Sequence, residues 1–398
     1  MTKKALIIQP GLQHSHQLAW ALYEQGLLDK FLSGVPVRTA EQVKPPLVPS
    51  SVWQRVKCVE VPADHRVALP AWWLAMKLAT SYGKQVSRFR NMHRVLHAFD
   101  RTMALRIRQL KPQAVVAYEN AALHTFKAAR AEGALCILDA ASFHYRTGNR
   151  LLESVDPEYQ KKINAWKSEE ISLADHVICC SELARQTYID AGLEPDRVTA
   201  LALGAYPPPN GTQPAVLLQA KPLRFIYAGA MRAVKSIDLV LAAFQRLHEQ
   251  RPGQIELHIY GGSDGTEWID QVKRIPNITY HGHVSQETLF GAMSQSHCLL
   301  MPSRIDSFGM VVAEAMAVGT PAIVSEQTGA KMIIERHPDA GWIVPIHLEP
   351  LVQLIERMLE SPDILQHARG AARLAAQDFT WLSYRRQAGQ AFSQLLAS

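Results

Sequence analysis

A carboxylate that interrupts an apolar segment is the residue of this sequence best suited to chemistry. Glu314 lies within the run VVAEAMAV, where an unpaired carboxylate is costly to bury, and Asp306 precedes it by eight positions in a polar loop. Gly309 begins the predicted helix between them, and the first N–H groups of a helix favour an anion. The pattern predicts a ligand with phosphates at this helix start and hydroxyl groups that donate to Glu314. A buried ion pair with an arginine is the alternative for Glu314, and helix capping is the alternative for Asp306.

Two cations follow a predicted strand earlier in the same half of the chain. Arg232 and Lys235 come after the strand 223–228 and Gly229. Side chains at the carboxyl edge of a parallel sheet can reach a bound diphosphate, so we expect both cations to bind phosphate. A solvated surface pair at the start of a helix is the alternative. The sequence shows no acidic cluster with metal-ligand spacing. We therefore expect these cations, and not a metal ion, to stabilise the negative charge of the diphosphate.

The elements that must position these residues alternate regularly between strand and helix, which predicts an α/β fold with parallel, doubly wound sheets. The strands predicted in the first half are 3–9, 113–118, 135–139, 177–180 and 198–203. Those of the second half are 223–228, 255–260, 278–281, 299–301 and 322–325. The predicted helices are 17–25, one ending near 110, 121–132, 161–174, 182–191, 237–250, 285–295, 309–318, 349–360, 363–376 and 381–396.

Length and composition limit the architecture and the partners. The 398 residues predict two domains: 1–205, then a proline-rich linker at 206–219, a second domain at 220–376 and a terminal segment at 377–398. Five scattered cysteines are typical of reduced thiols in a cytoplasmic protein, and we expect neither a signal peptide nor a transmembrane segment. The net charge of +6 suits an acidic partner, but no dense basic stripe indicates nucleic acid.

The second half resembles the retaining, nucleotide-sugar-dependent glycosyltransferases of family 4, also called group 1 glycosyl transferases. The resemblance is carried by Tyr227-Ala-Gly229 with Arg232 and Lys235, by His258-Ile-Tyr-Gly261-Gly262, by Gly282-His-Val284, and by the segment from Met301 to Pro321. It covers about the last 230 residues. It implies a GT-B fold, in which two Rossmann-like domains face a central cleft and the last helix crosses back to the first domain. A simple cap on the second domain is the alternative for that helix.

The resemblance also implies individual roles. Glu314 would bind the ribose hydroxyls of the donor, and Asp306, which stands where the family usually has Glu, would bind hydroxyls of the transferred sugar. Arg232 and Lys235 would bind the diphosphate, and Val284 would contact the base. The remaining donor-binding positions are Gly229, Gly261, Ser307, Phe308, Gly309 and Met310.

The first half matches the family only in outline, so its site residues are fewer. His144, in the loop after the strand 135–139, corresponds to a family histidine that faces the reaction centre, although an incidental histidine is as good a reading. Gly11 lies in the first strand–helix loop, where open α/β sheets place ligands, and could equally be a plain turn residue. His14 and His16 in the same loop are second candidates for acceptor contact or catalysis.

The predicted function is transfer of a sugar from a UDP- or GDP-type donor to a glycan or lipid-linked acceptor in bacterial-type surface polysaccharide biosynthesis, with no other cofactor. The alternatives are a catalytically silent nucleotide-sugar-binding subunit and a GT-B epimerase or phosphorylase. The segment 41–98 combines Trp53, Trp72 and Trp73 with basic residues that include Arg66, Lys77, Lys84, Arg88, Arg90 and Arg94. This fits either a peripheral contact with the inner face of a membrane or, as base rates favour, core tryptophans beneath a solvated basic face.

Overall fold

The computed structural model describes residues 3–45, 50–53, 56–151, 154–209, 221–263 and 265–397. These residues form two compact units. Unit 1 comprises 1–179, 185–201 and 384–398, and unit 2 comprises 180–184 and 202–383. Of the predicted linker 206–219, only the first four residues are among those described.

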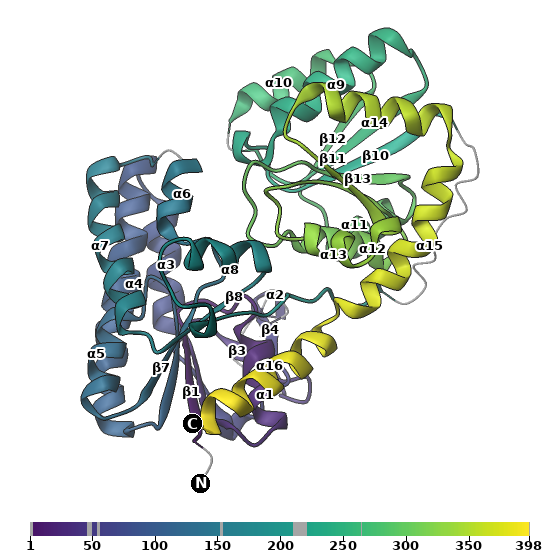
Figure 1. Cartoon of the computed structure of the whole chain (residues 1–398). Coiled ribbons are helices and arrows are strands. Elements are labelled where there is room, and N and C mark those ends of the chain that lie inside the picture. The colour runs from purple at the N-terminus through teal and green to yellow at the C-terminus, as the bar shows by residue number, and fades with distance from the viewer. Residues whose placement is uncertain are drawn as a thin grey trace. The chain divides into compact units, whose positions relative to one another are not determined.

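Unit 1 is built on a seven-stranded sheet in which all paired strands run parallel, in the order β5-β2-β1-β6-β7-β8-β9 (Figure 1). Its strands are β1 (Ala5–Gln9), β2 (Leu28–Ser33), β5 (Arg66–Ala68), β6 (Ala114–Tyr118), β7 (Leu135–Asp139), β8 (His176–Cys179) and β9 (Val198–Ala200). A separate two-stranded ladder pairs β3 (Val37–Arg38) with β4 (Lys57–Cys58). The central strands are buried on both faces, as parallel sheets covered by helices require.

The helices of unit 1 are α1 (Ser15–Glu24), α2 (Ser50–Trp53), α3 (Pro70–Ser81), α4 (Gln85–Leu110), α5 (Leu123–Ala131), α6 (Tyr145–Leu151), α7 (Pro157–Leu173), α8 (Glu182–Ile189) and α16 (Trp381–Ala397). From Tyr384 onward α16 belongs to unit 1. Near its end the carbonyl of Leu396 accepts from the N–H of Lys3 at 3.3 Å, and Gly389 packs against Gln25. The last helix of the chain therefore packs against the first strand and the first helix.

Unit 2 has a six-stranded parallel sheet in the order β12-β11-β10-β13-β14-β15. Its strands are β10 (Leu223–Ala228), β11 (Ile255–Tyr260), β12 (Ile278–Gly282), β13 (Cys298–Met301), β14 (Ala322–Ser325) and β15 (Gly341–Val344). Its helices are α9 (Ile237–Gln250), α10 (Thr266–Arg274), α11 (Gln286–Ser294), α12 (Met310–Ala317), α13 (Lys331–Arg336), α14 (Leu348–Glu360) and α15 (Asp363–Asp378). Alternate residues of β10 and β11 pack with α9 and α14 in one core.

The predicted fold class, two doubly wound parallel sheets, is confirmed, with differences at single elements. The structure adds β2, β3, β4, β5 and β15 to the predicted strands and α2, α3, α6, α10 and α13 to the predicted helices. Helix α1 begins at Ser15 rather than Gln17. The prediction of core tryptophans in residues 41–98 is wrong for Trp73, which is exposed, whereas Trp72 is half-buried against Phe99. In the described part of the chain, no helix is both long and apolar enough to cross a membrane.

Candidate functional site

Two cavities adjoin at the carboxyl edge of the unit 2 sheet. Their volumes are about 300 Å³ and 560 Å³, and Ala228, Gly229 and Val311 line both of them. The smaller cavity is lined by Lys235, Asp306, Ser307, Phe308, Gly309 and Met310, among others. The larger cavity is lined by Arg232, Tyr260, Gly261, Gly262, His283, Val284 and Glu314, among others. Every residue that the sequence predicted for donor binding in the second half of the chain therefore lines one of two connected spaces.

Glycines at the strand ends let the backbone approach closely here. A Cβ on Gly261 would lie 2.2 Å from the carbonyl oxygen of Gly229, and the φ of Gly261 is 126°, in the region that favours glycine. The N–H of Gly229 donates to the carbonyl of Tyr260, and the N–H of Gly261 donates to that of Gly282, each at 2.8 Å. The ends of β10, β11 and β12 are thereby tied together without a side chain between them.

Helix α12 begins at the smaller cavity, and Gly309 makes that start possible. Gly309 has a φ of 89°, and a Cβ there would meet the Met301 side chain at 3.1 Å and the Thr328 methyl at 3.2 Å. Among the described residues, no acceptor lies within hydrogen-bond distance of the N–H groups of Gly309, Met310 and Val311. Three such donors at a helix start favour an anion.

Lys235 and Asp306 meet at the same cavity. The Nζ of Lys235 donates to Oδ2 of Asp306 at 2.5 Å, across 71 positions of sequence. Oδ1 of Asp306 accepts from the N–H of Phe308 at 3.2 Å, so the capping role that was the alternative for Asp306 is present as well. No pattern in the sequence predicted that Lys235 and Asp306 would contact each other.

A second ion pair holds the two loops together. Arg304 donates to both carboxylate oxygens of Asp238 at 2.7 Å and to the carbonyl of Ala233 at 2.5 Å. Burial opposes ionisation of Asp238, but the hydrogen bonds and charge of Arg304 outweigh burial and lower the pKa of Asp238. Because Arg304 lies two residues before Asp306 and Ala233 two before Lys235, this fork fixes the spacing of the site pair.

The turn after β14 supports the same loop from the other side. The N–H of Gly329 donates to the carbonyl of Asp306 at 2.8 Å, and Ser325 Oγ donates to the carbonyl of Ser303 at 2.5 Å. A Cβ on Gly329 would lie 2.1 Å from the carbonyl oxygen of Ser307, so only glycine fits there.

Glu314 faces the larger cavity from the second turn of α12. It is half-buried, and burial raises the pKa of its carboxyl group. In the parts of the chain that the structure describes, no lysine, arginine or histidine lies within 4 Å of this carboxylate, so the alternative of an ion pair is not found. A carboxylate that lines a cavity without a partner is ready to accept hydrogen bonds from ligand hydroxyl groups.

In unit 1, the carboxyl edge of the sheet carries a buried pair that the sequence had half identified. The Nε2 of His14 lies 3.0 Å from Oδ1 of Asp139, the last residue of β7, and both side chains are buried. Burial by itself would lower the pKa of His14, but the charge of Asp139 and the hydrogen bond to it outweigh burial and raise the pKa. His16 is different: burial and the charge of Lys57 lower its pKa to about 4.

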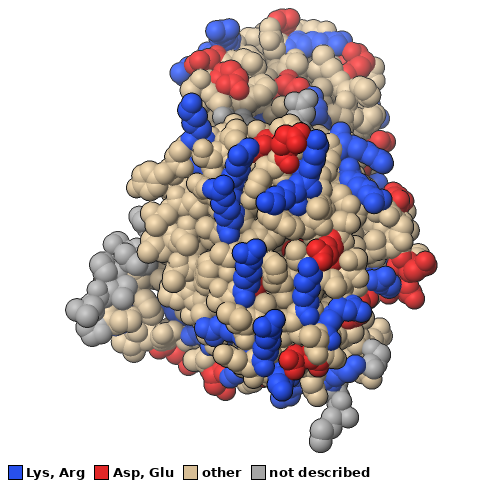
Figure 2. Space-filling model, turned by 90° about the vertical axis from the view of Figure 1, so that its left-hand side faces the viewer, with Lys and Arg blue, Asp and Glu red and all other residues tan. Residues whose placement is uncertain are grey.

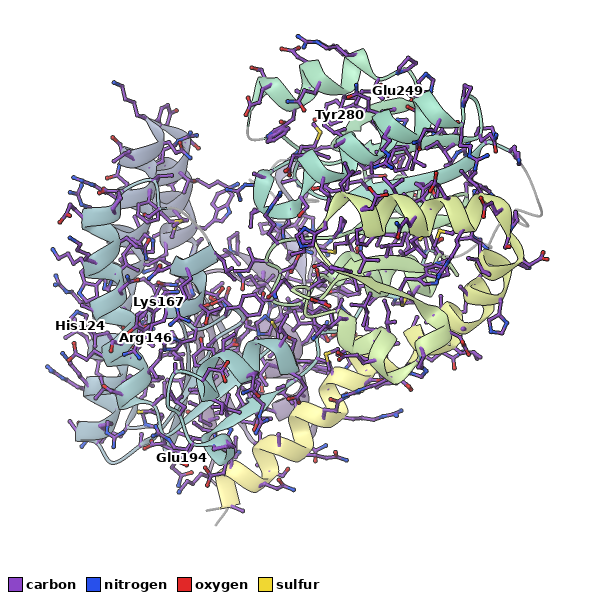
Figure 3. All side chains as sticks on the ribbon, turned by 45° about the horizontal axis from the view of Figure 1, so that its top comes forward. His124, Arg146, Lys167, Glu194, Glu249 and Tyr280 are labelled. Atoms are coloured by element: carbon purple, nitrogen blue, oxygen red, sulfur yellow. The ribbon has the colours of Figure 1, made fainter. Side chains whose placement is uncertain are left out.

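His144 and Gly11 lie at other places in unit 1. His144 is buried, and its backbone N–H donates to Thr187 Oγ1 at 2.9 Å. Its ring Nδ1 accepts from the backbone N–H of Arg146 at 3.3 Å. Burial and the charges of Arg146 and Lys167 lower its pKa to about 4, so the imidazole is neutral at pH 7 (Arg146 and Lys167 are labelled in Figure 3). Gly11 has open space where a Cβ would lie, so its backbone conformation does not require glycine.

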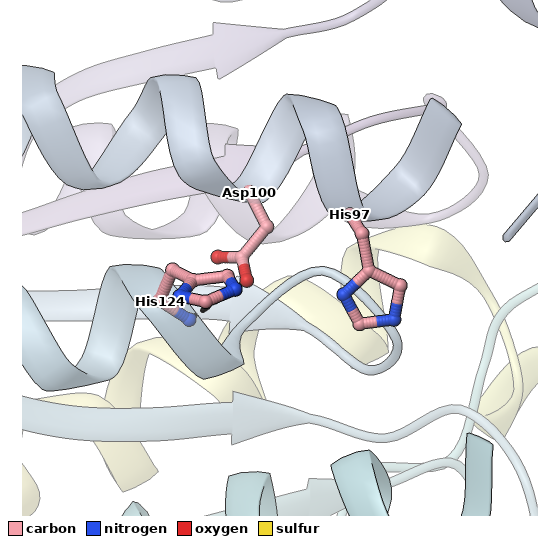
Figure 4. Close-up of side chains that lie close together, drawn as sticks. All are labelled: His97, Asp100 and His124. Carbon is pink, nitrogen blue, oxygen red and sulfur yellow. Dashed lines mark hydrogen bonds between the residues drawn. The ribbon is translucent and has the colours of Figure 1, made fainter. Parts of the chain in front are cut away.

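A third group of polar side chains, His97, Asp100 and His124, lies in unit 1 where α4 meets the start of α5 (Figure 4). One ligand atom of each lies within 4.8 Å of the others. Both oxygens of Asp100 accept backbone N–H groups, from His124 at 2.7 Å and Thr125 at 2.9 Å, and Arg101 donates to Nε2 of His124. These contacts make Asp100 a cap on the first turn of α5.

Comparison with known proteins finds a family that is similar to the second half of the chain. Residues 212–375 match the sequence family described as glycosyl transferases group 1. The chain is 28% identical over 165 residues to glycogen synthase of Mycobacterium tuberculosis, covering 40% of each, and 28% identical over 169 residues to D-inositol 3-phosphate glycosyltransferase of Streptomyces griseus, covering 39% of the chain and 36% of that protein. The chain thus aligns with about two fifths of the length of these relatives.

Solved structures match over nearly the whole chain. Sucrose-phosphate synthase from Thermosynechococcus elongatus has a TM-score of 0.71 at 19% identity, over 99% of this chain and 100% of that one. Anabaena HepE in complex with UDP and glucose has a TM-score of 0.63 at 16% identity, over 98% and 99%. The lipopolysaccharide glycosyltransferase WaaG has a TM-score of 0.64 at 12% identity, over 98% and 99%. The fold is therefore the GT-B fold, and residues 212–375, which carry Lys235, Asp306 and Glu314, are similar to the group 1 glycosyl transferases.

Proposed function

We propose that the protein is a retaining glycosyltransferase of family 4 that moves a sugar from a nucleotide diphosphate-sugar to a glycan or glycolipid acceptor. The observation that carries the proposal is the pair of connected cavities in unit 2, with a cation and a helix start at one end and the unpaired Glu314 at the other. A nucleotide diphosphate-sugar has the matching order of groups: sugar and phosphates, then ribose hydroxyls, then a base.

The donor is placed by charge and hydrogen bonding. Its phosphates accept from the free N–H groups at the start of α12 and from Lys235, and Arg232 approaches them from the larger cavity. Its ribose hydroxyls donate to Glu314, and its base lies near Val284. The Anabaena neighbour bound to UDP and glucose supports a UDP-type donor, and a GDP-type donor fits the same chemistry.

The reaction needs stabilisation of the charge that develops as the bond from the anomeric carbon to the diphosphate oxygen breaks. The electron pair of that bond passes to the diphosphate, where Lys235, Arg232 and the α12 start meet it. The acceptor oxygen attacks the same face of the sugar, and its proton goes to the departing diphosphate oxygen, so that no protein nucleophile is required. Asp306, held by Lys235 before the donor enters, then accepts from hydroxyls of the transferred sugar. We expect full activity in the presence of a metal chelator.

Unit 1 is proposed to bind the acceptor. His14 and Asp139 offer a hydroxyl-binding pair at the end of its sheet, with His144 as the other candidate from the sequence. The structural neighbours WaaG and WaaB act in lipopolysaccharide synthesis, which supports a surface-polysaccharide acceptor. Other neighbours make sucrose phosphate and trehalose phosphate, so acceptor identity is to be settled by assay.

A donor panel tests the proposal. Thermal shift with UDP-, GDP-, ADP- and TDP-sugars should show one stabilising nucleotide, and slow release of the nucleoside diphosphate should follow with that donor. Glu314→Ala should abolish the shift, whereas Glu360→Ala, an exposed carboxylate of the same unit, should leave it unchanged. Donor binding without turnover across a broad acceptor panel would instead identify a catalytically silent subunit, and an epimerised nucleotide-sugar as product would identify an epimerase.

A further inference from the structure

Helix α3 has an outward face that is unusual for a helix in contact with water. Its half-buried residues Trp72, Ala75, Met76 and Ala79 form the stripe that packs on α4, where the Trp72 ring meets Phe99 edge-on at 5.7 Å. The opposite face is expected to be polar. It carries Trp73, Leu74 and Leu78 instead, with Lys77 between them.

The apolar surface continues past the end of α3. Five of the thirteen large apolar side chains that are exposed in the described chain lie within residues 73–86. They are Trp73 (40% exposed), Leu74 (53%), Leu78 (53%), Tyr82 (71%) and Val86 (40%). Scattered exposed leucines are ordinary, but a cluster of this kind marks an interaction surface.

The charged residues of this segment of the chain have one sign. Residues 66–99 contain six lysines and arginines and no aspartate or glutamate. Lys77, Lys84 and Arg88 are exposed and make no ion pair with any residue that the structure describes. Figure 2 shows many lysine and arginine side chains, with fewer aspartates and glutamates among them, on the side of the molecule that lies at the left in Figure 1. The surface is therefore apolar at its centre and cationic at its border.

We propose that the surface formed by residues 73–88 docks on an anionic lipid bilayer. Trp73, Leu74, Leu78, Tyr82 and Val86 enter the boundary between headgroups and acyl chains, and the ammonium groups of Lys77 and Lys84 and the guanidinium of Arg88 contact lipid phosphates. Lys77 extends past the Trp73 ring, 6.0 Å from its centroid, which lets its stem lie on apolar surface while its charge reaches the headgroups. A protein partner with an acidic border would fit the charges, but aromatic and leucine side chains beside unpaired cations suit a lipid interface better. This docking does not depend on the proposed function.

Vesicle binding tests the proposal with the full-length protein. Co-sedimentation with phosphatidylglycerol–phosphatidylcholine vesicles at low salt should retain the protein, and pure phosphatidylcholine vesicles should retain at least tenfold less. Leu74→Ser/Leu78→Ser should lower the partition coefficient about tenfold, and Lys77→Glu/Lys84→Glu/Arg88→Glu should remove binding. Leu374→Ser/Leu382→Ser, which changes two exposed leucines elsewhere, is the matched control and should bind like the wild type.

Three results would overturn the proposal. The first is equal binding to neutral and anionic vesicles, and the second is unchanged binding by both surface variants. The third is a concentration-dependent dimer that Leu74→Ser/Leu78→Ser abolishes, since this would make the surface an interface between copies of the chain. Release of nucleoside diphosphate from a water-soluble donor should be unchanged in the surface variants, which separates a failure of docking from a failure of glycosyl transfer and confirms that the variants fold.

Discussion

The two sheets of this protein end in polar groups that are arranged in opposite ways. At the carboxyl edge of unit 2, Glu314 and the α12 start line cavities and have bonding capacity left. At the carboxyl edge of unit 1, His14 pairs with Asp139, and Glu119 accepts from Lys167 at 2.9 Å, with all these partners largely buried. The arrangement in unit 2 suits a ligand that carries several charges. The arrangement in unit 1 presents a small number of polar groups whose positions are already fixed by ion pairs.

Glycines meet close backbone approaches at the edges of both sheets. In unit 2, Gly261, Gly309 and Gly329 are each required by a close approach or a positive φ. In unit 1, Gly34 follows β2 and is required in the same way, since its Cβ would lie 2.2 Å from the carbonyl oxygen of Pro10. Gly11, in the first strand–helix loop, meets nothing. Backbone that approaches phosphate needs glycines such as Gly309, and the loop at Gly11 lacks that requirement.

The largest expected effect tests the charged end of unit 2. Lys235→Ala should lower the rate of glycosyl transfer about 10³-fold, because a preorganised cation at the developing charge contributes about 4 kcal/mol to the barrier. The measurement is steady-state release of nucleoside diphosphate with the donor found in the binding screen. Lys273→Ala, an exposed lysine of the same unit paired with Asp270, is the control and should keep full activity. If the rate of Lys235→Ala were within threefold of the wild-type rate, the proposed phosphate-binding role of Lys235 would be contradicted.

The second effect tests the buried pair of unit 1. Asp139→Asn should lower the free energy of unfolding by about 3 kcal/mol, because it leaves a buried histidine without its charged partner. The raised pKa of His14 means that its protonation stabilises the fold below its ordinary pKa of 6.5, and this contribution is lost as pH rises through the raised value. Urea unfolding should therefore show a larger difference between variant and wild type at pH 6 than at pH 9.

Asp64→Asn is the control for this pair. Asp64 lies 3.7 Å from His65 on the surface, so its loss should change stability little at either pH. If Asp139→Asn lost the same stability at pH 6 and pH 9, the pair would be held by its hydrogen bond alone, without a charged histidine.

The third effect tests whether glycine is required at position 261 of unit 2 and dispensable at position 11 of unit 1. Gly261→Ala should destabilise the fold by about 2 kcal/mol, because its Cβ would overlap the carbonyl of Gly229 and its φ of 126° is strained for alanine. Donor affinity should fall with it, since the strand ends that form the larger cavity must shift. Gly11→Ala should change stability by less than about 0.5 kcal/mol. Thermal or urea unfolding of both variants measures the comparison, and equal losses would contradict it.

The contrast also explains what could be predicted from sequence. Glu314, Gly309 and Lys235 lie beside the strands or helices that place them, so local patterns identified them. The ion pairs of the two sheet edges join residues that are distant in sequence. Lys235 meets Asp306 across 71 positions, Arg304 meets Asp238 across 66, and His14 meets Asp139 across 125. Only the folded sheet brings such pairs together, because no periodicity links them.

Two of the elements that were not predicted, β15 and α3, share a physical reason. The strand β15 reads GWIV, follows a proline-containing turn, and contains a glycine whose Cβ would lie 2.4 Å from the carbonyl of Ala322. The helix α3 reads as apolar and was expected to lie in a core, but its outward face remains exposed. In both cases the deciding information is which neighbour covers the segment, and that information is not local.

The smallest expected effect concerns the fork that joins the two unit 2 loops. Arg304→Ala should cost about 1 kcal/mol of stability, since Arg304 and Asp238 are both partly exposed. The matched control is Arg246→Ala, which removes another two-bond arginine–carboxylate pair, with Glu349, on the surface of the same unit. The two variants should lose similar stability in urea unfolding. Only Arg304→Ala should weaken donor binding, by about tenfold, because Lys235 and Asp306 would no longer be held at one spacing. If the control weakened donor binding equally, the loss would reflect general loosening of unit 2, and the fork would have no particular role in shaping the site.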